Sequence, residues 1–419
     1  MRLNLHDFSG HPFQVQLSRA LAFAGHQVLH GYSSQFVTGH GRLEVSAEDA
    51  ATLRIEGLSA SVPMIKYSPV GRTRFELNYA SAWQAILQRE RHDVVVACNV
   101  PLFTLARMRR YFAATKQPWV LWHQDLYSLG VGAEAARRLP GVASRAACGV
   151  VERLERSQVT SADAVVAITD AMVHQYGTWG IARDNVHVIP NWAPLDSIVP
   201  STRDNRWAKQ HDLPENAVRL MYAGTLGRKH NPLLLLELLD AAKARGIDAY
   251  LVVVSEGVGA DDLAAASAGR NDVKILGYQP AEDMTDMLSS ADAVIALLEP
   301  DAAQFSVPSK VLTYLAAGRP IVALMPRSNQ AAVDVREVGG FVGEPTVQGA
   351  HEAAQWLAGI TADADGLAAV GERARALAVN RFDIDRIAAQ FETILEDVVR
   401  SRTGAPLAVV ANPSERLVT

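Results

Sequence analysis

Cysteine is scarce in this sequence, which contains Cys98 and Cys148 and no other among its 419 residues. The two lie far apart in the chain and fit neither a metal-ligand spacing nor the pattern of a disulfide framework. Histidine spacings of the HxH or HxxxH type also form no convincing metal-ligating cluster. These absences argue against a disulfide-stabilised secreted domain and favour a reducing compartment, which we expect to be the cytoplasm.

Strong charge bias and long apolar runs are missing as well. A formal net charge of −5 gives no support to non-specific nucleic-acid binding. The run LLLLELLDAA is broken by Glu237 and is too short to span a bilayer. From Met1 the chain enters RLNLHDF, a short strand pattern, so we expect no signal peptide. The composition, 49% apolar and 20% charged, is that of a globular protein, and the length suggests two or three domains.

Short runs with strand character alternate with helical stretches along the whole chain. The expected strands lie at 2–8, 27–33, 62–69, 93–99, 118–125, 162–169, 186–192, 218–224, 249–257, 273–278, 292–299 and 320–325. Strands separated by helices favour parallel sheets with helices on both faces. Continuous apolar runs such as DVVVA suit strands that are buried on both sides. Twelve strands are too many for one compact sheet, so an α/β protein with two doubly wound domains is predicted.

The polar segment STRDNRWAKQHDLPEN separates the two sets of strands, and we interpret it as a linker near 200–216. This predicts an N-terminal Rossmann-like domain over 1–199 and a C-terminal Rossmann-like domain over 200–383. A helix at about 384–400 is expected to pack back on the first domain, and 401–419 is expected to be a loosely held tail. Because doubly wound sheets bind ligands beyond the carboxyl ends of their strands, two such domains facing each other predict a ligand cleft.

Two loops that follow strands of the first domain carry candidate site residues. Gly10 would let the backbone approach a ligand closely, although a plain tight turn explains it equally well. The six-residue glycine pattern of dinucleotide sites is absent. His123 and Asp125 follow the strand PWVLW, where a histidine can orient or deprotonate a sugar hydroxyl. A satisfied structural histidine is the alternative. The side chain of Trp122 is expected to point to the opposite side.

The first loop of the second domain, YAGTLGRKHNP, is predicted to hold phosphate. Gly224 and Thr225 lie in a flexible turn, and Lys229 supplies a positive charge. Asn231 can cap the following helix and Pro232 suits its first turn, so that the helix N-terminus faces the loop. A surface Arg-Lys pair is the alternative interpretation.

The stretch SVPSKVLTYLAAGRPIVAL, from 306 to 324, predicts a second helix start at the same sheet edge. Ser309 is positioned to cap the helix, while Lys310 and Thr313 share one of its faces. Gly318 ends the helix. Two anion-binding helix starts in one domain suit a diphosphate, and a solvated helix face is the alternative.

In order, YAGTLGRKHNP, VVVSEGVGADDL, VKILGYQPAEDMTDMLSSADAVIALL and PSKVLTYLAAGRPIVA resemble the C-terminal half of the retaining glycosyltransferases of family four, which have the GT-B fold. SADAVVAITDAMVHQYGTWG followed by NVHVIPNW is similar to the end of that family's N-terminal domain, and the resemblance covers most of residues 1–400. The IPNW and SVPSKVLTYLAAG variants most resemble the subgroup that builds bacterial surface polysaccharides, including the N-acetyl-fucosaminyl transferases.

The resemblance implies a retaining, metal-independent transferase that moves a sugar from a nucleotide-diphosphate donor, expected to be UDP-linked, to a glycan or lipid-linked acceptor. No cofactor beyond the donor is expected. The second domain would bind the donor, with Lys229 and Lys310 stabilising the leaving diphosphate and His123 aligning the sugar or acceptor. Two other classes stay open: a nucleotide-sugar 2-epimerase of the same fold, and a non-catalytic sugar-nucleotide-binding subunit.

The sequence departs from the family at two glutamates that usually lie eight positions apart. Phe305 and Thr313 stand at these positions, which puts the donor-sugar and ribose contacts of the family in doubt. Asp-x-Asp, the metal motif of sugar transferases with another fold, occurs at Asp363/Asp365 and Asp383/Asp385. Both pairs lie beside helical stretches and are interpreted as caps or surface charges, so no metal site is expected.

Arginines gather among small apolar residues in the stretch 133–158. They are Arg137, Arg138, Arg145, Arg153 and Arg156. A helix of this composition can lie on an anionic membrane surface, which would give a peripheral contact with the cytoplasmic membrane. A solvated helix face over an ordinary core is the alternative.

Overall fold

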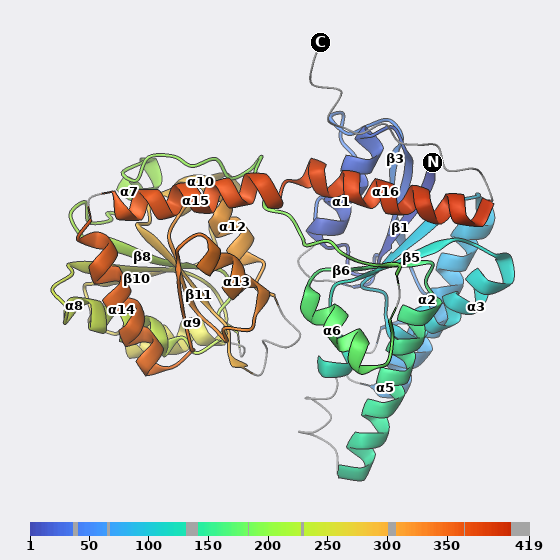
Figure 1. The fold of residues 1–419 in the computed structure, drawn as a ribbon, viewed down its shortest axis with the longest axis horizontal. Coiled ribbons are helices and arrows are strands. Elements are labelled where there is room, and N and C mark those ends of the chain that lie inside the picture. The colour runs from blue at the N-terminus through green and yellow to red at the C-terminus, as the bar shows by residue number, and fades with distance from the viewer. Residues whose placement is uncertain are drawn as a thin grey trace. The chain divides into compact units, whose positions relative to one another are not determined.

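The computed structural model describes residues 1–36, 41–64, 68–130, 141–182, 184–227, 230–300, 307–363 and 365–403. The chain divides into two compact units (Figure 1). Unit 1 comprises Met1–Ile189 and Asp385–Thr419, and unit 2 comprises Pro190–Ile384. The boundary therefore lies ten residues before the position predicted between 199 and 200.

Within the described residues, unit 1 is built on a seven-stranded parallel sheet with the order β3-β2-β1-β4-β5-β6-β7. Its strands are β1 (Arg2–Asp7), β2 (Gln27–Ser33), β3 (Leu53–Leu58), β4 (Val94–Cys98), β5 (Trp119–His123), β6 (Ala164–Ala167) and β7 (Val186–Val188). Both β4 and β5 are buried along their whole length, as expected for apolar runs in a covered parallel sheet. The order changes direction between β1 and β4, the kind of position where doubly wound sheets bind ligands.

The third strand is β3, and the described part of the strand predicted at 62–69, residues 62–64 and 68–69, forms no strand; residues 65–67 lie outside the described residues. Helix α2 (Pro69–Arg89) already begins at Pro69, and the Ser68 hydroxyl accepts a capping hydrogen bond from the Gly71 N–H at 3.1 Å. Proline has no N–H to donate to a ladder, so Pro63 and Pro69 favour a loop and a helix start over a paired strand.

Helices cover both faces of this sheet. They are α1 (Pro12–Phe23), α2, α3 (Leu102–Thr115), α5 (Gly141–Ser161), α6 (Asp170–Thr178) and α16 (Ile384–Thr403). Alternate side chains of β5 face opposite layers: Trp122 packs on Phe391 of α16 with ring centroids 4.9 Å apart, whereas His123 stacks on Tyr176 of α6.

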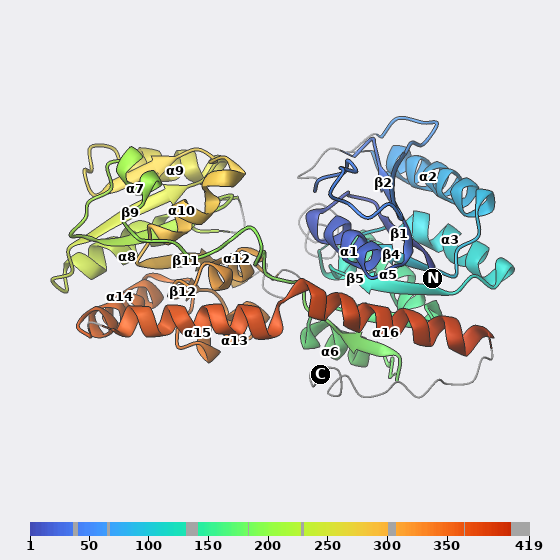
Figure 2. The same ribbon diagram turned by 90° about the horizontal axis from the view of Figure 1, so that it is seen from above.

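The last helix belongs to unit 1 although it follows unit 2 in sequence. Helix α16, red in Figure 2, corresponds to the helix expected at about 384–400, and its Glu392 carboxylate lies 2.9 Å from His26 Nε2. The expected tail lies outside the described residues beyond Thr403. No helix in the described ranges is long and apolar enough to cross a membrane.

Unit 2 contains, in its described part, a six-stranded parallel sheet with the order β10-β9-β8-β11-β12-β13. Its strands are β8 (Val218–Ala223), β9 (Ala249–Val254), β10 (Val273–Leu276), β11 (Ala293–Leu297), β12 (Ile321–Leu324) and β13 (Phe341–Gly343). The last of these was not among the strands expected from the sequence. The main helices are α7 (Arg206–Gln210), α8 (Leu233–Lys243), α9 (Val258–Ala266), α10 (Met284–Ser289), α12 (Lys310–Ala316), α13 (Gln330–Glu337), α14 (Val347–Thr361) and α15 (Gly366–Arg381).

Two hydrophobic clusters fill the two faces of this sheet. Leu220 and Tyr222 of β8 belong to a cluster with α8 and α14, while Met221 and Ala223 belong to a second cluster with α12, α13 and α15. This alternation confirms the prediction of parallel sheets covered on both sides, and hence of two doubly wound domains.

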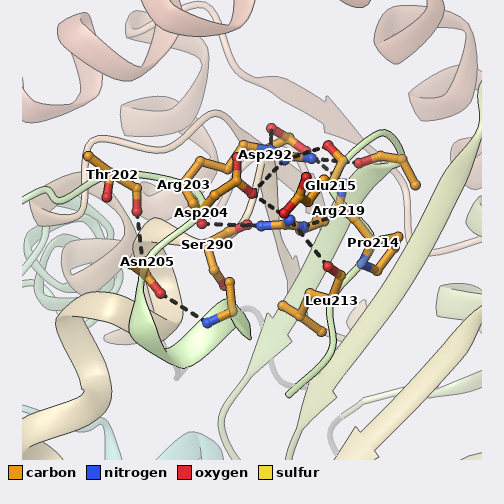
Figure 3. A network of polar contacts seen from close by, with 12 residues as sticks. Thr202, Arg203, Asp204, Asn205, Leu213, Pro214, Glu215, Arg219, Ser290 and Asp292 are labelled. Atoms are coloured by element: carbon orange, nitrogen blue, oxygen red, sulfur yellow. Dashed lines mark hydrogen bonds and ion pairs between the residues drawn. The ribbon is translucent and has the colours of Figure 1, made fainter. Parts of the chain in front are cut away.

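The segment predicted as a linker near 200–216 is instead part of unit 2. Arg219 is fully buried, and its guanidinium donates to Asp204 Oδ1 at 2.6 Å (Figure 3). It also donates to the carbonyls of Arg203, Leu213, Pro214 and Ser290. Trp207 of α7 is fully buried in the core. The linker interpretation rested on polar composition, but polar groups of this segment accept the hydrogen bonds of the buried Arg219 guanidinium.

Candidate functional site

A pocket of about 580 Å³ lies at the carboxyl edge of the unit 2 sheet. Its walls come from the ends of β8 and β9, the loop after β8, residues 278–279 after β10, helix α10 and the start of α12. Gly224, Thr225, Ser309, Lys310 and Thr313, all predicted site residues, line this one pocket. Lys229 and Phe305 lie outside the described residues.

Gly224 brings the backbone close to Lys310. Its φ is +123°, a conformation that favours glycine, and its N–H donates to Val254 O at 2.9 Å. A Cβ at this position would lie 3.2 Å from the Lys310 Nζ. Because Gly224 has no side chain, its backbone and the Lys310 ammonium can lie side by side at the pocket wall.

Lys310 presents a half-buried positive charge to the pocket. Its Nζ lies 3.9 Å from the Tyr222 ring centroid and donates to the Tyr222 hydroxyl at 2.5 Å. Among the described residues no carboxylate forms an ion pair with it. Burial lowers the pKa of Lys310 to about 7. A half-buried ammonium whose partners among the described residues are the ring and hydroxyl of Tyr222 is a suitable site for an anion.

Tyrosines that the sequence did not single out shape the same wall. The Tyr314 hydroxyl accepts from the Ala223 N–H at 3.0 Å and donates to the Ala223 carbonyl at 2.9 Å, which fixes the end of β8. The Thr225 hydroxyl bonds the Tyr278 hydroxyl. These tyrosines lie in patterns that also suit core positions, so position alone could not assign them to the site.

The helix starts differ in detail from the predictions. Ser309 occupies the N-cap position of α12, but its side chain makes no capping hydrogen bond and is exposed to solvent. At the start of α8, Pro232 occupies the N-cap position and no side chain caps the helix, although Asn231 Oδ1 accepts from the Leu233 N–H at 3.2 Å. Because the Ser309 hydroxyl makes no capping hydrogen bond, it remains available to a ligand.

In unit 1, Gly10 lies in a loop that is organised by Asp7. The Asp7 carboxylate is buried and accepts from the His11 N–H at 2.5 Å, the Ser9 N–H at 3.3 Å and Asn99 Nδ2 at 3.0 Å. Gly10 has a φ of +66°, so the turn itself requires glycine. Burial raises the pKa of Asp7 to about 6, because it costs the charged form more than these hydrogen bonds return. One sequence signal could have identified Asp7, namely its position at a strand end before a glycine turn.

His123 lies at the end of β5 with 5% of its surface exposed. Its Nδ1 lies 2.7 Å from the Tyr176 hydroxyl and its Nε2 lies 3.3 Å from Glu155 Oε1. Both ring nitrogens thus have protein partners, which is the arrangement of a structural histidine. Asp125 is exposed in the loop that follows. The catalytic roles of both residues stay predictions.

Glu155 connects His123 to the loop that carries Asp125. This fully buried carboxylate also accepts the N–H groups of Tyr127 at 2.6 Å and Ser128 at 3.0 Å. Burial opposes its ionisation, but the hydrogen bonds from His123 and Ser128 outweigh burial and lower the pKa of Glu155. The His123–Glu155 pair therefore holds the backbone just beyond Asp125 in place.

The two Asp-x-Asp pairs lie at helix starts. Asp365 directly precedes α15, and its N–H donates to Asp363 Oδ1 at 3.2 Å. Asp385 lies in the first turn of α16, two residues after Asp383. Their places agree with the interpretation as caps or surface charges, and metal independence stays a prediction.

Comparison with known proteins gives two family matches. Residues 12–192 match the glycosyl transferase 4-like domain, and residues 217–359 match the glycosyl transferases group 1. A protein named for colanic acid biosynthesis, the glycosyl transferase WcaI of Escherichia coli (strain K12), is 27% identical over 191 residues. That match takes in 42% of this chain and 45% of the relative, so it spans less than half of the relative's length.

Solved structures resemble the fold over almost the whole chain. Sucrose-phosphate synthase from Thermosynechococcus elongatus has a TM-score of 0.73 and 17% identity, covering 96% of this chain and 100% of its own. Anabaena Alr3699/HepE in complex with UDP has a TM-score of 0.68 and 17% identity, covering 95% and 100%. The two glycosyltransferase family matches account for most of both units, and the likeness to these solved structures shows that the chain has the two-domain GT-B fold.

Proposed function

We propose that this chain transfers a sugar from a UDP-linked donor to a glycan or lipid-linked acceptor, with retention and without a metal ion, in bacterial polysaccharide biosynthesis. The observation that carries the proposal is the Lys310 ammonium, which lies in a pocket at the carboxyl edge of the unit 2 sheet. The E. coli relative is named for colanic acid biosynthesis, and solved Anabaena structures hold UDP, UDP and glucose, or UDP-glucose. We place the reaction in the cytoplasm.

The donor diphosphate is assigned to the wall formed by Gly224 and Lys310. Lys310 would stabilise the negative charge that develops on the leaving diphosphate. Lys229, which follows Gly224 in the same sequence segment, would add a second positive charge. The hydroxyls of Ser309 and Thr313 lie on the same pocket and can donate to phosphate or ribose oxygens. With positive charge supplied by lysines, transfer needs no bound cation in this proposal.

The acceptor is assigned to unit 1, at the carboxyl edge of β1, β4 and β5. Gly10 and the backbone ordered by Asp7 would approach the acceptor there. We propose Asp125 as the side chain that meets the acceptor and His123 as a positioning residue, because both ring nitrogens of His123 already have partners. His123 would act through Glu155, which fixes the loop beyond Asp125.

Binding of UDP by titration calorimetry tests the donor site. Charge-assisted hydrogen bonds contribute about 1.5–3 kcal/mol, so Lys310→Ala is expected to weaken UDP binding about tenfold or more. An exposed lysine away from the pocket, Lys209, supplies the control Lys209→Ala, which should bind UDP like the wild type. Equal UDP affinity in wild type and Lys310→Ala would overturn the assignment.

Turnover distinguishes the proposed reaction from the two other classes. A transferase consumes UDP-sugar quickly only when an acceptor is supplied, and it yields a glycoside with the donor's anomeric configuration. A 2-epimerase converts the donor with no acceptor, whereas a binding subunit leaves the donor intact. The presence of Thr313 where the family carries glutamate makes this comparison necessary.

A further inference from the structure

We propose that the outer surface of α2, α3 and α5 in unit 1, here named the basic face, docks on an anionic lipid bilayer. The basic face is defined by the arginines Arg74, Arg107, Arg110, Arg145 and Arg153. Helix α2 packs on α3 and α3 packs on α5, so the three helices form one layer (Figure 1).

The charge of this layer is opposite to that of the chain. The three helices carry nine arginines and three glutamates, whereas the whole chain has a net charge of −5. Two of the glutamates, Glu76 and Glu155, are buried, and the third, Glu152, lies 3.8 Å from Arg156. Within the described residues, Arg74, Arg110, Arg145 and Arg153 form no ion pair. Unpaired arginines concentrated on one layer attract a negatively charged surface.

A groove of about 590 Å³ crosses this layer and has a mixed lining. Arg107 and Arg110 line it together with Phe103, Tyr111, Leu77 and Leu154. The Arg107 Nη1 donates to the Leu77 carbonyl at 2.7 Å, which holds that guanidinium against the groove. Guanidinium groups beside aromatic and aliphatic surface suit a phospholipid headgroup, whose phosphate and glycerol regions need both kinds of contact.

Exposed valines favour a bilayer over a soluble acidic polymer. Val142 is 74% exposed and Val150 is 54% exposed, both in the first half of α5. At about 100° per residue, these valines and the arginines Arg145 and Arg153 fall within about 140° of the circumference of α5, so they lie on one side of the helix. Figure 1 shows this half of α5 extending past the other helices of unit 1. Apolar side chains beside arginines are typical of a helix that enters the membrane interface.

Docking here would bring a lipid-linked acceptor to the acceptor edge, a consequence that rests on the proposed function. Helix α3 begins at Leu102, four residues after β4 ends at Cys98. The basic face therefore starts beside the sheet edge where Asp7, Gly10 and Asn99 lie. A carrier lipid held in the bilayer would have its saccharide end near this edge.

Co-sedimentation of the full chain with vesicles tests the docking. The probes are phosphatidylcholine vesicles with and without phosphatidylglycerol, at low and high salt. We expect binding to the anionic vesicles that is lost at high salt, because screening weakens the attraction. Each arginine near an anionic surface contributes a factor of about five, so the double variant Arg110→Gln/Arg153→Gln is expected to bind about thirtyfold more weakly.

A matched control uses two exposed arginines of unit 2, Arg327→Gln/Arg336→Gln, which make the same change in charge. This variant should bind anionic vesicles like the wild type. A native melting temperature for both double variants shows that folding is intact. Val142→Ser/Val150→Ser should weaken binding to vesicles and leave any binding to dextran sulfate unchanged.

Several outcomes would overturn the proposal. They are equal binding to neutral and anionic vesicles, equal losses in both double variants, or binding to dextran sulfate without binding to vesicles. The last result would assign the basic face to an acidic polymer. UDP affinity is measured separately, so a failure of the donor-site proposal would appear as lost UDP binding with vesicle binding retained.

Discussion

The Nζ of Lys310 lies 3.9 Å from the centre of the Tyr222 ring and 2.5 Å from the hydroxyl of the same tyrosine. These contacts join the first residue of α12 to the end of β8 through the amine of Lys310. The charge is poorly hydrated, since burial lowers the pKa of Lys310 to about 7. The protonation of Lys310 is therefore linked to both ligand binding and stability.

Binding of UDP is predicted to take up a proton near pH 7.5. The free lysine is partly neutral there, and a bound diphosphate favours its charged form. UDP affinity should therefore fall as the pH rises above about 7. Calorimetry in two buffers with different ionisation enthalpies measures the uptake. Lys310→Arg keeps the charge at all these pH values, so it should bind UDP without this uptake. Identical uptake in wild type and Lys310→Arg would contradict the prediction.

The stability of the ligand-free protein should depend on Lys310 in the opposite sense. The folded pKa, about 7, lies below the ordinary value of 10.5, so between these values the unfolded chain binds more protons. The contribution of Lys310 to stability therefore rises with pH across this window and is least favourable below pH 7. Urea unfolding of wild type and Lys310→Met at several pH values measures it. The free energy of unfolding of Lys310→Met, relative to the wild type, should decrease as the pH increases from 7 toward 10. A difference in unfolding free energy that stays constant over this range would contradict the prediction.

His123→Ala is predicted to reduce stability. Removal of the imidazole leaves the buried Glu155 carboxylate and the Tyr176 hydroxyl each without one partner, at a cost of about 1–3 kcal/mol. Thermal and urea unfolding check the loss. Asp262→Asn is the comparison, because this exposed side chain of α9 should leave the melt unchanged. A native melt in His123→Ala with turnover reduced 100-fold or more would show that His123 acts in the chemistry itself.

Gly371→Ala is predicted to destabilise unit 2, since a Cβ there would lie 2.3 Å from the Gly318 carbonyl oxygen. The backbones of α15 and the end of α12 meet at this point and would have to separate. Gly359 in α14 provides the control, because its Cβ would meet nothing within 4 Å. Gly359→Ala should stabilise by about 0.5–1 kcal/mol through helix propensity. Equal melting temperatures for the two variants would contradict this prediction.

Arg219→Met is predicted to cost about 3 kcal/mol or more of unfolding free energy. The change leaves Asp204 and four backbone carbonyls without the guanidinium that they share. Arg245→Met is the control, because that exposed guanidinium donates to one carbonyl, Ala241 O. Urea unfolding of both variants measures the two losses of unfolding free energy. Similar losses would mean that the buried network around Arg219 contributes little to stability.

The residues that line the unit 2 pocket could be predicted from the sequence because the rules that place them are local. Strand ends place Gly224 at the sheet edge, and helix periodicity puts Lys310 and Thr313 on one face. The tyrosines could not be assigned in this way. Tyr222 and Tyr314 lie in apolar runs, and only the meeting of β8 with α12 shows that they position Lys310.

The errors arose where distant contacts override local composition. The expected strand at 62–69 has suitable residues, but prolines and the cap of α2 decide otherwise. Polar residues near 200–216 suggested a linker, yet Arg219, which comes after them, binds them through its guanidinium. His123 was recognised by its place at a strand end, whereas its partners Glu155 and Tyr176 come from helices that no spacing rule connects to it.

The buried Arg219 also determines where the chain can be cut. The group 1 family match begins at residue 217, but a fragment that begins there would lack Arg203, Asp204 and Trp207. Such a fragment would keep the guanidinium in its core without most of its acceptors, and it should aggregate when expressed. A fragment that begins at Pro190 retains all of them. The smallest independently folding piece of unit 2 therefore includes the polar segment that resembles a spacer.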